Sequence, residues 1–178
     1  MAQRHGPLLG GAPSSDALSA VYYSIFASPI GDMLLTGDGA ALTGVDFLDR
    51  TADPVGQRDD GAFAEATTQL RAYFGGELTE FNLELATGGT PFQQRVWSAL
   101  RAIPYGTTTS YGRLAATLGD VRATRAVGSA NGRNPISIII PCHRVIGADG
   151  SLTGYGGGMD RKQWLLALEG RALPFVGS

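Results

Sequence analysis

Apolar and polar positions in the first third of the chain follow a strand-and-turn pattern. β-Rich residues over 21–26 predict one strand, and two further strands are predicted over 32–36 and 41–48. Turns are expected at the Ser-Pro-Ile-Gly sequence ending at Gly31 and at the Asp-Gly pair ending at Gly39. This part of the chain is therefore predicted to begin as short strands joined by tight turns.

A helix is predicted after these strands, beyond a polar loop over 51–60. Glycines at 75–76 predict where this helix ends. Apolar residues then alternate over 81–85, which predicts a half-buried strand. The apolar positions at helical spacing are Phe63, Leu70, Tyr73 and Phe74.

The second half of the chain is predicted to be mainly helical. Thr90 is a good N-cap, Pro91 suits the first helical position, and Gln93 completes a capping box. The helix that starts there is expected to stop at the Pro-Tyr-Gly sequence that begins at Pro104. Its apolar stripe consists of Phe92, Val96, Ala99, Leu100 and Ile103.

Two short helices come next and lie close together in the sequence. Ser110 can cap the first, which ends before Gly119, and the second runs from about 124 to 131. This spacing resembles a helix-turn-helix, although an ordinary helical hairpin is the commoner arrangement. Arg122 and Arg125 favour the DNA-binding arrangement. Small residues would let the second helix approach a groove closely: Ala126, Gly128, Ser129 and Ala130.

An almost wholly apolar run over 136–140 predicts a buried strand that Pro141 ends. Cys142 and His143 follow at once, so we expect the strand to hold this pair against a rigid edge. A final helix is predicted over 161–169. Its buried side is expected to carry Trp164, Leu165 and Leu168.

Length and composition predict an α/β protein of two packed domains. The chain has 178 residues, of which 43% are hydrophobic, and this is enough for a real core. A boundary near 87–89 predicts a small sheet-and-helix domain over 20–86, packed on a mainly helical domain over 90–170. Residues 1–19 are predicted to be a flexible extension and residues 171–178 a tail.

Membrane insertion and secretion are not expected. No apolar run approaches the roughly 18 residues that span a bilayer, and the start of the chain lacks a signal-peptide pattern. The lone cysteine also suits a reducing compartment. We therefore expect a cytoplasmic protein with no membrane partner.

Charge is unevenly distributed, although the chain as a whole carries only −2. Residues 46–85 contain nine acidic residues and three arginines, whereas residues 91–145 contain seven arginines and one acidic residue. The first stretch is net −6 and the second net +6. This asymmetry suggests an anion-binding face on the second half, and a solvated charged surface explains it equally well.

Cys142 and His143 carry the most specific chemistry. A lone cysteine is most often a small buried hydrophobe. Here, however, His143 can act as a base directly or through a water, and Arg144 adds positive potential, so both favour the nucleophilic thiolate. Glu169 is the candidate that orients the histidine. A cysteine hydrolase or acyltransferase would use the same groups, so these residues alone leave the reaction open.

Several motifs occur in a distinctive order over the second half. They are Asn134-Pro135, the Ile-Pro-Cys-His-Arg-Val sequence over 140–145 and the Gly-Tyr-Gly-Gly-Gly sequence over 154–158, with further matches over 92–97, 110–111, 125–128 and 164–169. In this order they resemble the O6-alkylguanine-DNA alkyltransferases, also called methylated-DNA–protein-cysteine methyltransferases. The similarity is dense from about 90 to 170 and looser from 20 to 85.

This resemblance implies DNA repair by direct reversal. The alkyl group on O6 of guanine, and also on O4 of thymine, would move irreversibly and once per protein molecule to Cys142. His143 would activate the thiol through a water, and Glu169 would orient the histidine. No cofactor is implied. Some family members hold a structural zinc through Cys and His in the N-terminal half, but this chain lacks those residues there, so we expect no metal.

The resemblance also implies how double-stranded DNA is bound and how the damaged nucleotide is flipped. Tyr111 would press on its phosphate, and Arg125 would fill the vacated space. Asn134 would brace the helix around 126–131 against the active-site segment. That helix, with Ala126, Gly128 and Ala130, would enter the minor groove. The flipped guanine would be enclosed by Val145, whose backbone carbonyl would help to read it, and by Tyr155 and Gly156.

The family resemblance further implies a ribonuclease-H-like N-terminal domain and a winged-helix-like helix-turn-helix in the C-terminal domain. We expect a monomer and leave open whether it binds DNA cooperatively. Two rival functions also stay open. One is a module that binds lesions and recruits other repair factors without modifying Cys142, and the other is a cysteine hydrolase that turns over small esters or amides.

Overall fold

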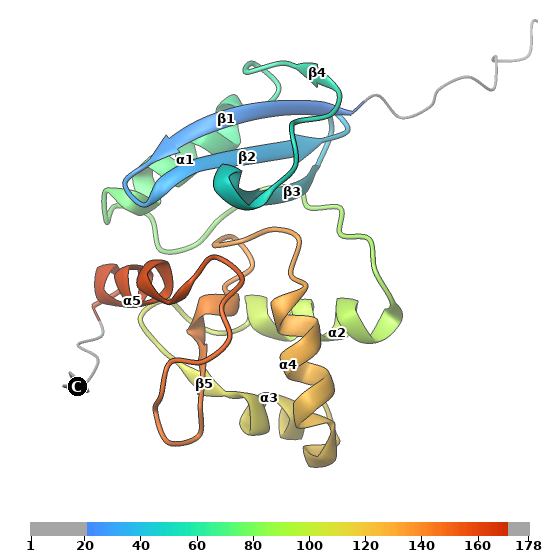
Figure 1. The fold of residues 1–178 in the computed structure, drawn as a ribbon, viewed down its shortest axis with the longest axis vertical. Helices are drawn as coiled ribbons and strands as arrows, with labels where there is room; N and C mark the ends of the chain where they lie inside the picture. The colour runs from blue at the N-terminus through green and yellow to red at the C-terminus, as the bar shows by residue number, and fades with distance from the viewer. Residues whose placement is uncertain (1–20, 171–178) are drawn as a thin grey trace, which may run out of the picture.

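The computed structural model describes residues 21–170 and shows two parts stacked on each other (Figure 1). A sheet and helix α1 form one part, and helices α2 to α5 with their connecting loops form the other. The α/β class and the two-part organisation expected from the sequence are therefore confirmed. The predicted extension over 1–19 and the tail over 171–178 lie outside the described residues.

Three antiparallel strands form most of the four-stranded sheet, as the strand-and-turn pattern predicts. These strands are β1 (Tyr22–Ser28), β2 (Gly31–Gly37) and β3 (Leu42–Phe47), and the sheet order is β3-β2-β1-β4. The region expected to be a loop over 51–60 contains the short strand β4 (Gln57–Arg58), which pairs in parallel with β1. A 3₁₀ turn, η1 (Leu48–Arg50), follows β3.

Helix α1 (Ala64–Phe74) packs against the sheet through Leu70 and neighbouring apolar residues. The strand expected over 81–85 is not formed. Its side chains do alternate in exposure, but among these residues the backbone forms a β-bridge at Leu85 alone, to Leu42. An alternating pattern reports which side chains face the core, and an extended segment crossing between two domains satisfies it without a strand partner.

The helical part starts with α2 (Pro91–Arg101), which begins where the sequence predicts. Its capping box is complete, because the Gln93 amide donates to Thr90 Oγ1 at 3.2 Å and the Thr90 amide donates to Gln93 Oε1 at 2.9 Å. The helix buries Val96, Trp97 and Leu100 in the core.

Helices α3 (Tyr111–Thr117) and α4 (Thr124–Gly132) pack on each other, joined by the 3₁₀ turn η2 (Val121–Ala123). Ser110 caps α3 by accepting from the Arg113 amide at 3.2 Å, as expected. Two very short strands, β5 (Thr109–Ser110) and β6 (Val145–Ile146), pair in parallel next to these helices.

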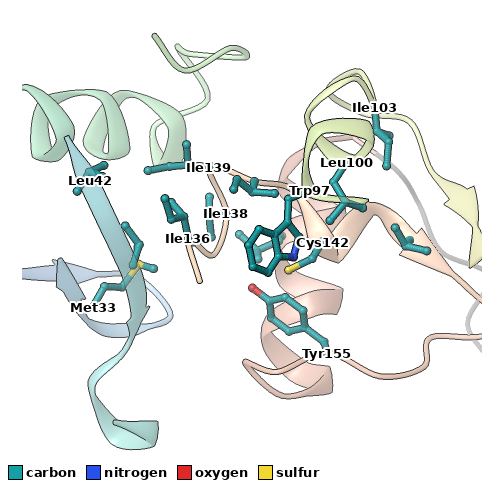
Figure 2. Close-up of a cluster of buried hydrophobic side chains, with 14 of the residues drawn as sticks. Met33, Leu42, Trp97, Leu100, Ile103, Ile136, Ile138, Ile139, Cys142 and Tyr155 are labelled. Carbon is teal, nitrogen blue, oxygen red and sulfur yellow. The ribbon is translucent and has the colours of Figure 1, made fainter. Parts of the chain in front are cut away.

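The apolar run over 136–140 is buried as predicted, but the prediction that it forms a strand is wrong. Ile138 has a φ of 72°, and Ser137 and Ile140 form a bridge, so the run folds into a tight turn. Its first residues attach to β3, since the Ser137 amide donates to the Val45 carbonyl at 2.8 Å. Isoleucines 136, 138 and 139 fill the space between β2–β3 and α2 (Figure 2). A short apolar run predicts burial, and a buried turn meets that requirement as well as a strand does.

Helix α5 (Met159–Leu168) closes the structure, but its buried face differs from the expected one. Lys162, Leu165 and Leu166 point inward, whereas Trp164 is 37% exposed and lies 5.9 Å from the Phe74 ring. The aromatic residue is therefore at the edge of the domain junction rather than in the core. Within residues 21–170, no helix is both long and apolar enough to cross a membrane.

Arg161 of α5 links the two parts of the molecule directly. Its guanidinium pairs with Asp49 at 2.9 Å, donates to the Ile30 carbonyl at 2.8 Å and lies 4.0 Å from the centre of the Phe47 ring. Gly31 sits at the β1–β2 turn with a φ of 118°, and a Cβ there would meet the same guanidinium at 2.8 Å. The turn of the sheet is thus fitted to the helix that precedes Glu169.

Candidate active site and DNA-facing surface

Cys142 lies at the start of the 3₁₀ turn η3 (Cys142–Arg144), where the polypeptide passes from the apolar turn to β6. Its side chain is buried, and Asn134 Nδ2 approaches the sulfur at 3.1 Å. The same amide donates to the Ile140 carbonyl at 2.7 Å, and Asn134 Oδ1 accepts from the Ile136 amide at 3.0 Å. Asn134 was expected to brace the helix, and in the structure its side chain bonds to the active-site segment over 136–142, including the thiol itself.

The thiol of Cys142 needs a base. Burial raises its pKa, although the hydrogen bond from Asn134 and the charge of Lys162 act in the opposite direction. A buried thiol is therefore protonated at rest, and it becomes a strong nucleophile only when its proton is removed.

His143 follows in the same turn and is fully buried. Its Nε2 lies 2.8 Å from Glu169 Oε1, so the pair expected from the sequence is brought together. Burial lowers the pKa of His143, so the neutral ring is favoured. Since an ionised carboxylate only accepts hydrogen bonds, the ring proton belongs on Nε2, which leaves Nδ1 as an acceptor. Among the described residues, Nδ1 has no hydrogen-bond partner.

Glu169 is held by both domains. Arg144 donates to both carboxylate oxygens, each at 2.9 Å, and the Tyr73 hydroxyl of α1 donates to Oε1 at 2.7 Å. Burial alone would raise the pKa of Glu169, but the hydrogen bonds from His143 and Arg144 outweigh it and lower that pKa to about 2. Glu169 is therefore a carboxylate at neutral pH.

Arg144 does not have the role that the sequence suggests. We expected it to add positive potential to the thiol, but its guanidinium is buried, paired with Glu169 and bonded to the Ile103 carbonyl at 2.6 Å. Its charge is neutralised by the carboxylate that it orients. We refer to His143, Arg144 and Glu169 as the buried charge network.

Lys162 is a site residue that sequence reasoning missed. It is the single lysine of the chain, and it is fully buried on α5. Its ammonium donates to the carbonyls of Val145, at 2.5 Å, and Thr153, at 2.9 Å, and burial lowers its pKa to about 8. A lone lysine on the same helical face as Leu165 and Leu166 was the available signal, because an apolar face rarely carries an unpaired charge.

The surface beside Cys142 is open. A hollow of about 590 Å³ is bounded on one side by α3 and α4 and on the other by the loop over 153–156. Gly132, Tyr155 and Gly156 also line a smaller cavity of about 100 Å³, together with Cys142 and Asn134. The thiol therefore lies next to the open hollow, separated from it by these three shared residues. The hollow itself is lined by Tyr111, Thr124, Arg125, Gly128, Gly132 and residues 153–156.

Two tyrosines shape the open hollow. The Tyr111 hydroxyl donates to the Thr153 carbonyl at 2.9 Å, so it ties α3 to the loop across the opening. Tyr155 is buried, and its hydroxyl has no hydrogen-bond partner among the described residues. Burial raises the pKa of Tyr155 well above its usual value, so it stays protonated and able to donate.

Helix α4 presents most, but not all, of the residues expected to face DNA. Arg125 and Ala126 are exposed and Gly128 is half-buried. Ala130, which was also expected to face DNA, is 3% exposed, and its carbonyl accepts from Trp97 Nε1 at 2.9 Å, so its side chain packs in the core rather than on the helix surface. Within residues 21–170, no cluster of three or more His, Cys, Asp or Glu side chains could hold a metal ion.

Two family models together match most of the chain. One is described as 6-O-methylguanine DNA methyltransferase, ribonuclease-like domain, and matches residues 21–87. The other is described as 6-O-methylguanine DNA methyltransferase, DNA binding domain, and matches residues 91–171.

Curated relatives named methylated-DNA–protein-cysteine methyltransferase are similar over nearly their whole length. The one from Mycobacterium leprae is 60% identical over 145 residues, which is 80% of this chain and 88% of the relative. The one from Mycobacterium tuberculosis is 55% identical over 157 residues, which is 86% of this chain and 95% of the relative.

Solved structures of similar proteins have the same fold as this chain. The crystal structure of Mycobacterium tuberculosis O6-methylguanine methyltransferase is 57% identical and superposes with a TM-score of 0.80, covering 85% of this chain and 94% of that chain. The crystal structure of Mycobacterium tuberculosis OGT in complex with DNA is 57% identical, with a TM-score of 0.80, and covers 83% of this chain and 92% of that one. The family resemblance seen in the sequence is confirmed, and the chain belongs to the 6-O-methylguanine DNA methyltransferase family.

Proposed function

We propose that this protein is a methylated-DNA–protein-cysteine methyltransferase, which repairs DNA directly by moving an alkyl group from O6 of guanine to its own Cys142. The observation that carries this proposal is the position of the lone thiol. Cys142 lies between the buried charge network and an open hollow large enough to admit a base. The family and the relatives named above support the same reaction.

The chemical step uses the buried charge network on one side of Cys142 and the open hollow on the other. His143 Nδ1 takes the thiol proton through a water, and Glu169 stabilises the imidazolium that forms. The thiolate attacks the alkyl carbon, so that a carbon–sulfur bond forms while the carbon–oxygen bond to guanine breaks. The electron pair of that bond leaves with the base. Tyr155 is our candidate for protonating the leaving base, which gives the N–H of guanine. The thiol proton held on His143 then passes to the Tyr155 oxygen, so both side chains end in the protonation state in which they began.

Substrate recognition is proposed to occur in the open hollow. The O6 atom of a paired guanine lies inside the stack, so the nucleotide must rotate out of the duplex. Tyr111 presses on the phosphate of the target nucleotide, Arg125 fills the space left behind, and α4 with Ala126 and Gly128 enters the minor groove. Tyr155 and Gly156 enclose the flipped base. The Val145 carbonyl accepts one hydrogen bond from Lys162, so its second lone pair is available to accept from the flipped base.

The finer expectations are proposals that the family supports. These are O4-alkylthymine as a second substrate, a ribonuclease-H-like N-terminal domain, and a winged-helix-like helix-turn-helix built from α3 and α4. We propose that the protein acts as a monomer. A cytoplasmic location suits both a DNA substrate and a nucleophilic thiol that must stay reduced.

A labelling experiment separates this function from its two rivals. Incubation with duplex containing O6-methylguanine, followed by intact mass and peptide mapping, should place one methyl group on the peptide that contains Cys142, and unmodified duplex is the control. A lesion-binding module would bind the same duplex and keep a free thiol. A cysteine hydrolase would keep a free thiol and turn over small esters.

A further inference from the structure

The hydroxyl of Tyr73 reaches the active site from the other domain. Tyr73 lies in the last turn of α1, is fully buried, and packs its ring edge-on against Tyr105 at 6.1 Å and beside Phe81 at 5.3 Å. Its hydroxyl donates to Glu169 Oε1 at 2.7 Å. A residue 96 positions away in the sequence therefore contacts the carboxylate that orients His143.

Three donors share this one oxygen atom. Oε1 of Glu169 lies 2.7 Å from the Tyr73 hydroxyl, 2.8 Å from His143 Nε2 and 2.9 Å from the Arg144 guanidinium. A carboxylate oxygen distributes its negative charge among the donors that point at it, so each donor weakens the attraction felt by the others. The Tyr73 contact is therefore electrostatic as well as structural.

The direction of the hydrogen bond is fixed. Burial first, and then the charge of Glu169, raise the pKa of Tyr73 far above its usual value, so the phenol keeps its proton. An ionised carboxylate has no proton to give. Tyr73 is consequently the donor, and its hydroxyl partly neutralises the negative charge of the same oxygen that accepts from His143.

We propose that Tyr73 is a positioning residue for alkyl transfer: its hydroxyl orients the Glu169 carboxylate and limits the basicity of His143, so the N-terminal domain tunes the active site of the C-terminal domain. The proposal rests on the proposed function, because it assigns Tyr73 a part in the same reaction. It gives the sheet domain a chemical role in a site whose nucleophile and base both lie elsewhere.

Other groups that can carry charge also surround His143 and Glu169, and they come from every element packed against these two residues. A variant that removes only the Tyr73 hydroxyl leaves all of them in place, so its effect isolates this contact. These groups are Cys142 and Arg144 of η3, Lys162 of α5, Tyr105 before β5, and Tyr155 of the glycine-rich loop, whose ring lies 6.5 Å from that of His143.

The sign of the effect follows from electrostatics. Without the hydroxyl, more of the negative charge on Glu169 faces His143, which stabilises the imidazolium and raises the pKa of His143. An imidazolium cannot accept the thiol proton, so activity at the acid end of the pH profile should fall. We expect the acid limb to move up by about half a pH unit, which is roughly a threefold loss of rate below it.

The test compares Tyr73→Phe with Tyr105→Phe. Both variants keep the aromatic ring and lose one hydroxyl of the same aromatic cluster. The Tyr105 hydroxyl differs because its residue is half-buried and because it bonds to the Leu168 carbonyl at 3.3 Å rather than to Glu169. Transfer from free O6-benzylguanine is measured against pH, so nucleotide flipping does not enter. The pKa of His143 is followed by NMR on histidine-labelled protein, which is practical because the chain contains two histidines.

The proposal predicts that Tyr73→Phe raises both the acid limb and the His143 pKa, while Tyr105→Phe coincides with wild type. Identical acid limbs in all three proteins would overturn it, as would an equal shift in both variants or a rate loss that is uniform across pH. If wild type itself transfers no alkyl group, the proposed function fails instead.

A measurement on wild type keeps the proposal testable if Tyr73→Phe does not fold. The Tyr73 hydroxyl proton should exchange slowly and show a nuclear Overhauser contact to the His143 ring, because both donors meet on one oxygen. The lack of such a proton in the folded protein would overturn the proposal.

Discussion

The two sides of Cys142 are built on opposite principles. On the inner side, His143, Arg144 and Tyr73 all bond to Glu169 at 2.7–2.9 Å in a buried cluster. On the outer side, Tyr111, Arg125 and the loop over 153–156 surround an open hollow of about 590 Å³. The charged groups of the inner side pair with one another, whereas Arg125 on the outer side is exposed to solvent.

This difference divides the work of the proposed reaction. A preorganised inner side can stabilise the charge that develops on His143 without rearrangement during the chemical step. Of the outer side, Tyr111 and Arg125 are needed only to extract a nucleotide from duplex DNA. Substitutions on the inner side should therefore slow transfer from every substrate, and substitutions of Tyr111 or Arg125 should slow transfer from duplex alone.

The largest change short of removing the thiol is expected from Glu169→Gln. It leaves the Arg144 guanidinium buried without its counter-ion, which should lower the free energy of unfolding by about 3–5 kcal/mol. It also removes the group that stabilises the His143 imidazolium. Transfer should therefore slow by roughly 10²-fold or more on duplex and free base alike. Glu77→Gln, the same change at an exposed carboxylate of the sheet domain, should alter neither quantity in urea unfolding and rate measurements.

Arg125→Ala should break the outer side alone. Loss of the residue that fills the vacated space should slow transfer from duplex by about 10–100-fold. The reason is that rotating a nucleotide out of the duplex costs a few kcal/mol, and nothing would then occupy the gap it leaves. Transfer from free O6-benzylguanine should stay within about twofold of wild type. Arg101→Ala removes the same charge from an exposed position at the end of α2 and serves as the control. Equal losses on both substrates would refute the flipping role.

The inner side should also make stability depend on pH. The pKa of Glu169 is lowered from 4.5 to about 2 in the folded protein, so the carboxylate stabilises the fold fully above its unfolded-state value. That contribution is lost as the pH falls from about 4.5 towards 2. Denaturant midpoints measured through this window should drop for wild type, and they should drop less for Glu169→Gln. Parallel curves would show that Glu169 is not the group responsible.

The smallest expected effect is that of a metal chelator. The described residues contain no cluster of His, Cys, Asp or Glu suited to a metal ion, and the proposed chemistry needs none on either side of Cys142. Protein treated with chelator should transfer at the rate of untreated protein. Stoichiometric zinc found by elemental analysis, and lost together with activity, would contradict this prediction.

Local signals in the sequence predicted local structure well. The capping box of Thr90 and Gln93 and the cap at Ser110 depend on neighbours within three residues, and both are confirmed. The strands β1 to β3 were likewise visible, because alternation and turn glycines act over short distances. The turn over 136–140 was not, because burial by two domains imposes the same apolar pattern on a turn and on a strand.

The residues of the active site that belong to a sequence motif could be predicted, whereas those brought to the site by the fold from distant parts of the chain could not. Cys142 and His143 are neighbours in the chain, and Glu169 was found through the final helix. Tyr73 and Lys162 carry no motif, since their partners lie 96 and 17 residues away, respectively. The pairing of Arg144 with Glu169 was missed for the same reason, because its charge could be counted from the sequence but its counter-ion could not be placed.

The central claim, that Cys142 accepts the alkyl group once and permanently, is tested most directly by stoichiometry. A thioether at Cys142 has no electrophilic carbonyl for water to attack, and the chain has no second cysteine to receive the group. With excess duplex carrying labelled O6-methylguanine, repaired guanine should reach a plateau at one per active protein, with the label on the peptide containing Cys142. Cys142→Ala should bind the duplex and repair none of it. Repeated turnover, or label on any other residue, would contradict the mechanism.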